Sequence, residues 1–235
     1  MKKRLAPFYA LIAIFTLTAG ICSKDDPTGP SSNDLVDLFP IPITDASSLF
    51  PSVDDAFLNV SFTMDFEFPF YGTSYNSVYL NTNGGLTFGS GNSSYDEASN
   101  EVTYPGIAVF WGDMDASAYE ADTRAHQMTY QQYSDRFVVT YTQFQDNDDV
   151  AMNNTATLTL YDDGRIIIQY GAVLSDDILI GVWDGTHTSD IHTDAATMTF
   201  TNFDGLGTGV ILHDYWNEDA SYDGRYNSHT VTFNP

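Results

Sequence analysis

Four aspartates in two separate segments could together bind a hard divalent cation. Asp113 and Asp115 follow the apolar run that ends at Trp111, and Asp146 and Asp148 lie in a second acidic segment. Alternate residues of a strand point to the same face, so the carboxylates of Asp113 and Asp115 can converge on one ion. Carboxylate oxygens are ligands that calcium prefers, although no stretch has the EF-hand spacing. These four aspartates are therefore the candidate calcium ligands, and turn aspartates that cap backbone N–H groups are the simpler interpretation.

The pair Asp113 and Asp115 could in principle also serve glycoside hydrolysis, which is the main enzymatic alternative. That chemistry needs two carboxyl groups about 5–9 Å apart beside a cleft, with the pKa of one raised by burial. Among 32 acidic residues some pairs are inevitable. The chain has no Gly-x-Ser-x-Gly or His-Glu-x-x-His motif and no cysteine in the predicted domain. We therefore expect a protein that binds rather than catalyses, with no cofactor other than calcium.

Two further groups of residues could recognise ligands. The segment after Trp183 holds histidines and aspartates, but their spacing is not that of a known transition-metal site, so an ordinary polar loop is the simpler interpretation. These residues are Asp184, His187, Asp190, His192 and Asp194. Aromatic residues in predicted loops could stack on sugar rings or anchor a protein partner, or could simply pack on the surface. They are Tyr95, Tyr119, Tyr215, Trp216 and Tyr222.

The N-terminus has the features of an export signal. Basic residues at positions 2–4 precede an apolar run over residues 5–17, which is too short to span a bilayer. The following stretch, LTAGICSKDD, resembles a bacterial lipoprotein signal in which Cys22 is lipidated, although Ile21 stands where a small residue is usual. Cleavage after Gly20 would instead release a soluble protein. We expect a signal peptide over 1–21, and a cell-surface or outer-membrane lipoprotein or a secreted protein.

Charge narrows the partners that the chain can have. It carries 8 Lys plus Arg against 32 Asp plus Glu, a formal net charge of −24. Such a surface repels nucleic acid and anionic lipid, because phosphate contacts need Lys and Arg. We therefore expect no nucleic-acid partner, and membrane contact only through the N-terminal lipid. An extracellular protein or a glycan remains the expected partner.

Strand patterns dominate the rest of the chain. Residues 22–52 read as a flexible tether and an extended, proline-containing lead-in, and 53–235 as one domain. Apolar and polar residues alternate from Leu58 to Phe68, and Thr155 to Tyr170 reads as a hairpin around Asp163-Gly164. Turn signals recur about every ten residues, without a convincing helical period. We predict an all-β fold, an antiparallel β-sandwich or partly closed barrel of about 10–13 short strands.

Five blocks in this order resemble the nidogen-type (NIDO-like) extracellular domain. Two departures are Val109, where the family commonly has proline before Phe-Trp, and the lack of the disulfides of animal versions. The blocks are FPFYGTSYNSVYLNTNGGLTFG (68–89), YPGIAVFWGDMD (104–115), RFVVTYTQF (136–144), LTLYDDGRIIIQY (158–170) and ILIGVWDGT (178–186). The resemblance implies a non-enzymatic extracellular module for adhesion or ligand capture. A surface glycan-binding accessory lipoprotein is the alternative, and a carboxylate-based hydrolase is a third.

Overall fold

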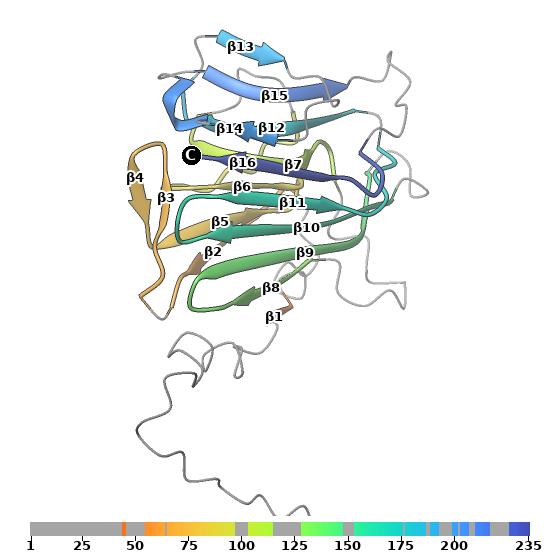
Figure 1. Cartoon of the computed structure of the whole chain (residues 1–235). Coiled ribbons are helices and arrows are strands. Elements are labelled where there is room, and N and C mark those ends of the chain that lie inside the picture. The colour runs from red at the N-terminus through yellow and green to blue at the C-terminus, as the bar shows by residue number, and fades with distance from the viewer. Residues whose placement is uncertain are drawn as a thin grey trace, which may run out of the picture.

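The structure is a computed structural model in which sixteen strands form two seven-stranded sheets and one hairpin (Figure 1). It describes residues 44–45, 55–63, 65–96, 103–114, 128–147, 153–175, 177–186, 189–192, 199–201, 203–206, 210–216 and 226–235. Besides strands, these residues form a 3₁₀ helix, Phe203–Leu206. None of them belongs to a helix with the length and apolar character that a membrane crossing requires.

One sheet, called here the β9 sheet, has the strand order β1-β8-β9-β10-β11-β16-β14. Its strands are β1 (Thr44–Asp45), β8 (Met128–Gln132), β9 (Arg136–Gln145), β10 (Asn153–Tyr161), β11 (Ile166–Tyr170), β16 (Thr230–Asn234) and β14 (Thr199–Thr201). All neighbours are antiparallel except β14 and β16, which are parallel.

The other sheet, called the β7 sheet, has the order β13-β15-β12-β7-β6-β5-β2. Its strands are β13 (Ser189–His192), β15 (Val210–Trp216), β12 (Ile178–Asp184), β7 (Pro105–Trp111), β6 (Gly85–Thr87), β5 (Ser77–Asn81) and β2 (Phe57–Ser61). Here too one edge pair, β13 with β15, is parallel and the remaining pairs are antiparallel.

The two sheets pack face to face, and their inward side chains form one apolar core. Leu80, Ile107 and Val182 from the β7 sheet are fully buried in the same cluster as Leu158 and Ile168 from the β9 sheet. Period-two alternation explains this, because every second residue of a strand points to the same face. Within the described residues the sheets share no strand, so the fold is a sandwich and not a partly closed barrel.

The strand count exceeds the expected 10–13 because several strands are too short to show alternation. Strands β1, β3 and β14 contain only two or three residues each. The predicted hairpin at Thr155–Tyr170 is confirmed: β10 and β11 pair in register around Gly164, which has a φ of 86°. Asp-Gly tolerates this positive φ, which tight hairpin turns require.

The continuous strand predicted from Leu58 to Phe68 is wrong. The chain leaves β2 after Ser61, turns through Asp65 at a φ of 58°, and starts β3 at Phe68. Phe66 between the two strands is nevertheless buried in the core. The alternation therefore marked which side chains are buried, while the backbone between them changes direction.

Strands β3 (Phe68–Phe70) and β4 (Thr73–Tyr75) form a separate hairpin across one end of the sandwich (Figure 1). Its turn residues Tyr71 and Gly72 have φ values of 46° and 73°. Two successive positive φ angles are the mark of a type I′ turn, which matches the twist of the flanking strands. The side chains of Phe68 and Phe70, both in β3, are fully buried.

Tyr141 on β9 carries a fully buried hydroxyl for which the described residues offer no hydrogen-bond partner. Phe110 and Phe144 surround its ring, and burial raises the pKa of the hydroxyl above its usual range. An unpaired buried polar group costs about 1–3 kcal/mol. Tyr141→Phe is therefore expected to raise the free energy of unfolding by up to about that amount, measured by urea denaturation.

Tyr170→Phe is the matched control, because the Tyr170 hydroxyl donates a hydrogen bond to the Val109 carbonyl at 2.7 Å. Its removal should destabilise the protein by about 1 kcal/mol. Equal effects of Tyr141→Phe and Tyr170→Phe would show that the Tyr141 hydroxyl is satisfied after all.

Candidate functional site

A β-bulge in β7 determines which way the side chains at its end point. The N–H groups of Val109 and Phe110 both donate to the Gly84 carbonyl, at 3.0 and 3.2 Å, and the pairing of β7 with β12 shifts register at this place. A bulge inserts one extra residue and re-aims the side chains that follow. Val109 and Phe110 both enter the core, and Trp111 is turned to the outer face of the β7 sheet.

On that outer face Trp111 stacks on Trp183 of β12. The ring centroids are 5.4 Å apart and the ring planes differ by 25°. With Ala108 and Leu179 the two indoles form a second buried apolar cluster, separate from the core. Gly106 makes room for it, since a β-carbon there would lie 2.7 Å from Cε2 of Trp183. Glycine in a strand often marks such a close approach.

Both indole N–H groups donate to backbone carbonyls, which fixes the orientation of the rings. Trp111 Nε1 donates to the Ser94 carbonyl at 3.0 Å, and Trp183 Nε1 donates to the Tyr104 carbonyl. The Ser94 carbonyl also accepts from Asn83 Nδ2 at 3.1 Å. Residues 89–96 are thereby held against the outer face of the sheet, with Gly91 packed on the Phe57 ring.

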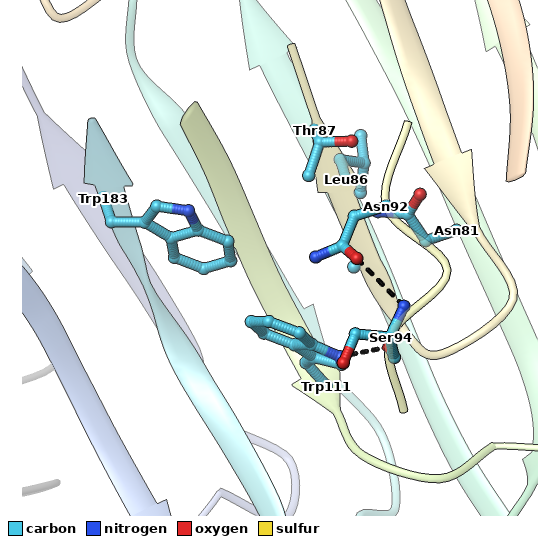
Figure 2. Close-up of a pocket in the computed structure, with 8 residues that line it drawn as sticks. Asn81, Leu86, Thr87, Asn92, Ser94, Trp111 and Trp183 are labelled. Atoms are coloured by element: carbon cyan, nitrogen blue, oxygen red, sulfur yellow. Dashed lines mark hydrogen bonds between the residues drawn. The ribbon is translucent and has the colours of Figure 1, made fainter. Parts of the chain in front are cut away.

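A small hollow remains between residues 89–96 and the outer face of the β7 sheet (Figure 2). Eight residues line it, and none of them has a charged side chain. Figure 2 shows Trp111 and Trp183 side by side on neighbouring strands, with Ser94 next to Trp111. The free space for water centres is about 10 Å³, which is room for about one water molecule.

Two polar atoms of the hollow lack a hydrogen bond within the described part of the chain. They are Oδ1 of Asn81 on β5 and Oγ1 of Thr87 on β6. Their residues are 6% and 2% exposed, so bulk water does not satisfy them. Buried polar atoms in native proteins almost always have partners, so these two are exceptions. The hollow therefore combines apolar indole walls with two polar atoms that are closed to solvent.

The predicted calcium ligands are only partly described. The end of β7 and the end of β9 do lie together: the Asn147 N–H donates to the Asp113 carbonyl at 2.9 Å, and Asn147 Nδ2 to Asp113 Oδ2 at 3.2 Å. Asp146 pairs with Met114 in an isolated bridge. Asp115 and Asp148 lie outside the described residues. The described residues contain no group of three metal-ligating side chains. Calcium binding therefore stays a prediction.

Comparison with known proteins identifies the family. A family model described as NIDO related matches residues 40–209, more than half of the chain. The chain belongs to the NIDO-related family. No curated protein and no solved structure matches the chain. The match confirms the resemblance seen in the five sequence blocks, and a NIDO-related domain fits an extracellular-type binding module.

The aromatic candidates are distributed differently in this NIDO-related domain than the sequence suggested. Tyr95 is exposed, as expected for a loop aromatic, and directly follows Ser94 at the hollow. Tyr215 and Trp216 are not loop residues: they end strand β15, opposite Leu179 and Ile178 of β12. The apolar run at 210–212 gave no sign that the strand continues. Tyr119 and Tyr222 lie outside the described residues, as does Cys22.

The predicted polar loop after Trp183 is in part a strand. Asp184 ends β12, and its Oδ1 accepts hydrogen bonds from the N–H and Oγ1 of Thr186 at 2.9 and 2.8 Å. Asp190 and His192 lie in β13, which pairs with β15. His187 and Asp194 lie outside the described residues. Asp184 therefore caps the turn that follows β12.

The residues of the hollow were not singled out from the sequence. Trp111 and Trp183 sit in strongly apolar runs, which are typical of core strands, and nothing in the sequence distinguishes Asn81 and Thr87 from ordinary turn and strand residues. One signal was available: small residues at Gly85, Gly106 and Ala108 recur on strands of otherwise large side chains. Such residues leave room for a large side chain to lie flat on the sheet.

Proposed function

We propose that this NIDO-related chain is a non-catalytic ligand-capture and adhesion module that a bacterial cell displays on its surface or secretes. The observation that carries the proposal is the family match over residues 40–209, joined to a recessed hollow on the outer face of the sandwich. The hollow lies outside the core, on the outer face of the β7 sheet.

The chemistry of the hollow supports binding rather than turnover. General acid–base catalysis needs an ionisable side chain within reach of the reacting atom. The side chains that line the hollow are neutral amides, hydroxyls, indoles and an aliphatic group. They can orient and desolvate a ligand, but none of them exchanges protons near neutral pH.

Attachment through Cys22 completes the proposal. Cys22 is the single cysteine of the chain, directly follows the apolar leader and precedes the acidic run SKDD. A diacylated cysteine would hold the domain at the membrane by its lipid, with residues 22–52 as a spacer. The acidic surface would then keep the domain away from anionic headgroups.

The test follows the full chain in bacterial cells. We expect protease added to intact cells to digest it, and Cys22→Ala to move it from the membrane fraction to the soluble fraction. Cells carrying the wild-type chain should adhere to surfaces coated with mucin or matrix protein, and Cys22→Ala should abolish this adhesion. Mass spectrometry should find the coat unaltered after contact with purified protein. Resistance of the chain to external protease, or fragments released from the coat, would refute the proposal.

A further inference from the structure

We propose that the free edge of strand β2 (Phe57–Ser61) is a self-association surface. The β2 strand of a second copy of the chain pairs with it in antiparallel orientation, about a two-fold axis at Asn59. The pairing joins the β7 sheets of the two copies into one continuous sheet. It goes beyond ligand capture, because it brings displayed copies into contact with one another.

Strand β2 is the least protected sheet edge among the described residues (Figure 1). Natural proteins protect edge strands by shortness, charged side chains, proline or bulges. The other edge strands are shorter than the five residues of β2: β1 has two, β14 has three, and β13 has four with Asp190 among them. Strand β2 reads FLNVS, without charge or proline, and its pairing with β5 shows no register shift. Such an edge is a template for a further strand.

Two hydrogen bonds at the ends of the β2–β5 ladder determine which residues of β2 face the free edge. The Thr82 N–H donates to the Ala56 carbonyl at 2.9 Å, and the Phe62 N–H donates to the Asn76 carbonyl at 2.8 Å. In an antiparallel ladder, residues that bond the neighbouring strand alternate with residues whose N–H and C=O groups point the opposite way. The residues of β2 that point away from β5 are therefore Phe57, Asn59 and Ser61.

These same residues are open to solvent. Phe57 is 46% exposed, and Asn59 and Ser61 are exposed as well, whereas Val60 between them is buried in the core. No described strand lies on the far side of β2. A partner strand can therefore approach the edge without displacing part of the described structure.

The strand is self-complementary in the antiparallel register centred on Asn59. Asn59 of one copy then lies opposite Asn59 of the other, and Phe57 lies opposite Ser61. Because the outward-facing residues of the two strands meet, each of their N–H groups finds a C=O group of the second copy. The same patch serves both copies, which is the form of a closed two-fold dimer.

Charge favours this strand over other surfaces of the chain. The net charge of −24 makes two copies repel one another, and like charges directly opposite each other destabilise a strand pair. Strand β2 is uncharged, and the register places Asp55 of one copy opposite Thr63 of the other rather than opposite an acid. Two copies thus meet here without opposed carboxylates. The remaining long-range repulsion makes the association weak and dependent on salt.

Sedimentation velocity of the purified full chain measures the association. We expect a monomer–dimer equilibrium over the micromolar to millimolar range. Its dissociation constant should fall as the ionic strength rises from about 0.01 M to about 0.15 M, because the Debye length shortens from about 30 Å to about 8 Å. A chain that stays monomeric at both ionic strengths, or a dimer that salt dissociates, would overturn the proposal.

Variants of Asn59 separate the edge contact from folding. Asn59→Pro removes an N–H group that points away from β5, so the ladder within the sheet is kept. It should raise the dissociation constant of the dimer at least tenfold and leave the thermal midpoint near that of the wild type. Asn59→Thr is the matched control, since it keeps the N–H group, and it should dimerise as the wild type does. A dissociation constant that Asn59→Pro leaves unchanged would place the contact elsewhere.

Cysteine cross-linking tests the register and does not depend on the proline variant. Cys22→Ala first removes the single cysteine of the chain. Asn59→Cys then places two thiols across the two-fold axis at a Cα separation of about 5.5 Å, within the range of disulfides. Ser61→Cys is the control on the same strand, because four residues of strand, about 14 Å, separate its thiols. We expect mild oxidation to cross-link Asn59→Cys and not Ser61→Cys, and equal cross-linking of both would overturn the two-fold pairing.

Discussion

Replacing Gly84 by alanine is expected to destabilise the domain by about 2–5 kcal/mol, a large fraction of the stability of an ordinary domain. Gly84 has a φ of 77°, which costs an L side chain about 1–2 kcal/mol. A β-carbon there would also lie 2.6 Å from both the carbonyl oxygen and Cδ2 of Phe110, so backbone has to move. The movement would disturb the bulge that turns Trp111 outward. Urea denaturation followed by circular dichroism measures the loss.

Two other glycines separate the steric clash from the backbone strain. Gly72 and Gly89 have φ values of 73° and 79°, and a β-carbon on either would meet nothing within 4 Å. Gly72→Ala and Gly89→Ala should therefore each cost only the strain, about 1–2 kcal/mol. If Gly84→Ala lowers the free energy of unfolding no more than these two variants do, the close approach to Phe110 adds no steric cost.

Phe88→Ala is expected to cost about 3–5 kcal/mol and to loosen the β3–β4 hairpin. The Phe88 ring is fully buried, with ring centroids of Phe68, Phe70 and Tyr75 at 5.4, 5.0 and 4.9 Å. A two-stranded hairpin is marginal without support, and Phe88 connects this one to the sandwich. Unfolding gives the overall cost, and faster limited proteolysis at the Tyr71 turn would reveal the local opening.

The control for Phe88 is Phe57, which is 46% exposed at the edge of the β7 sheet. Its ring contacts Tyr79 with a centroid distance of 5.7 Å. Phe57→Ala should cost about 1 kcal/mol, since it removes a partly exposed group and opens no enclosed cavity. Similar losses for Phe57→Ala and Phe88→Ala would contradict the central role given to the Phe88 ring.

The sequence predicts the fold best where local chemistry and burial agree. Asp163-Gly164 between two β-prone runs predicts the β10–β11 hairpin, because turn type and alternation fix the register together. The run from Leu58 to Phe68 shows the limit of alternation. Val60, Phe66 and Phe68 all reach the core from different pieces of backbone, and the break at Asp65 left no clear sign.

The candidate site was harder to predict because it depends on a break in the pattern. Without the bulge at Val109 and Phe110, strict alternation would place Trp111 on the core side with Ile107 and Val109. The bulge uses the N–H of Val109, which a proline at this position would lack. The hydrogen bonds of Asn83 could not be predicted either, because they join segments that are separated in the sequence. Its Nδ2 donates to Asp55 Oδ1 and to the Ser94 carbonyl, and its Oδ1 accepts from the Met114 N–H.

Strand β1 has a mechanical consequence for how the domain carries load. It is held by two cross-strand pairs, Thr44 with Tyr130 and Asp45 with Thr129, whereas β8 behind it pairs with β9 over five. A force applied to the chain ahead of Thr44 acts on those two pairs first and peels β1 from β8. Peeling bares N–H and C=O groups along β8, and an open edge recruits other strands. A stretched molecule thus offers neighbours a strand edge that a relaxed one covers in part.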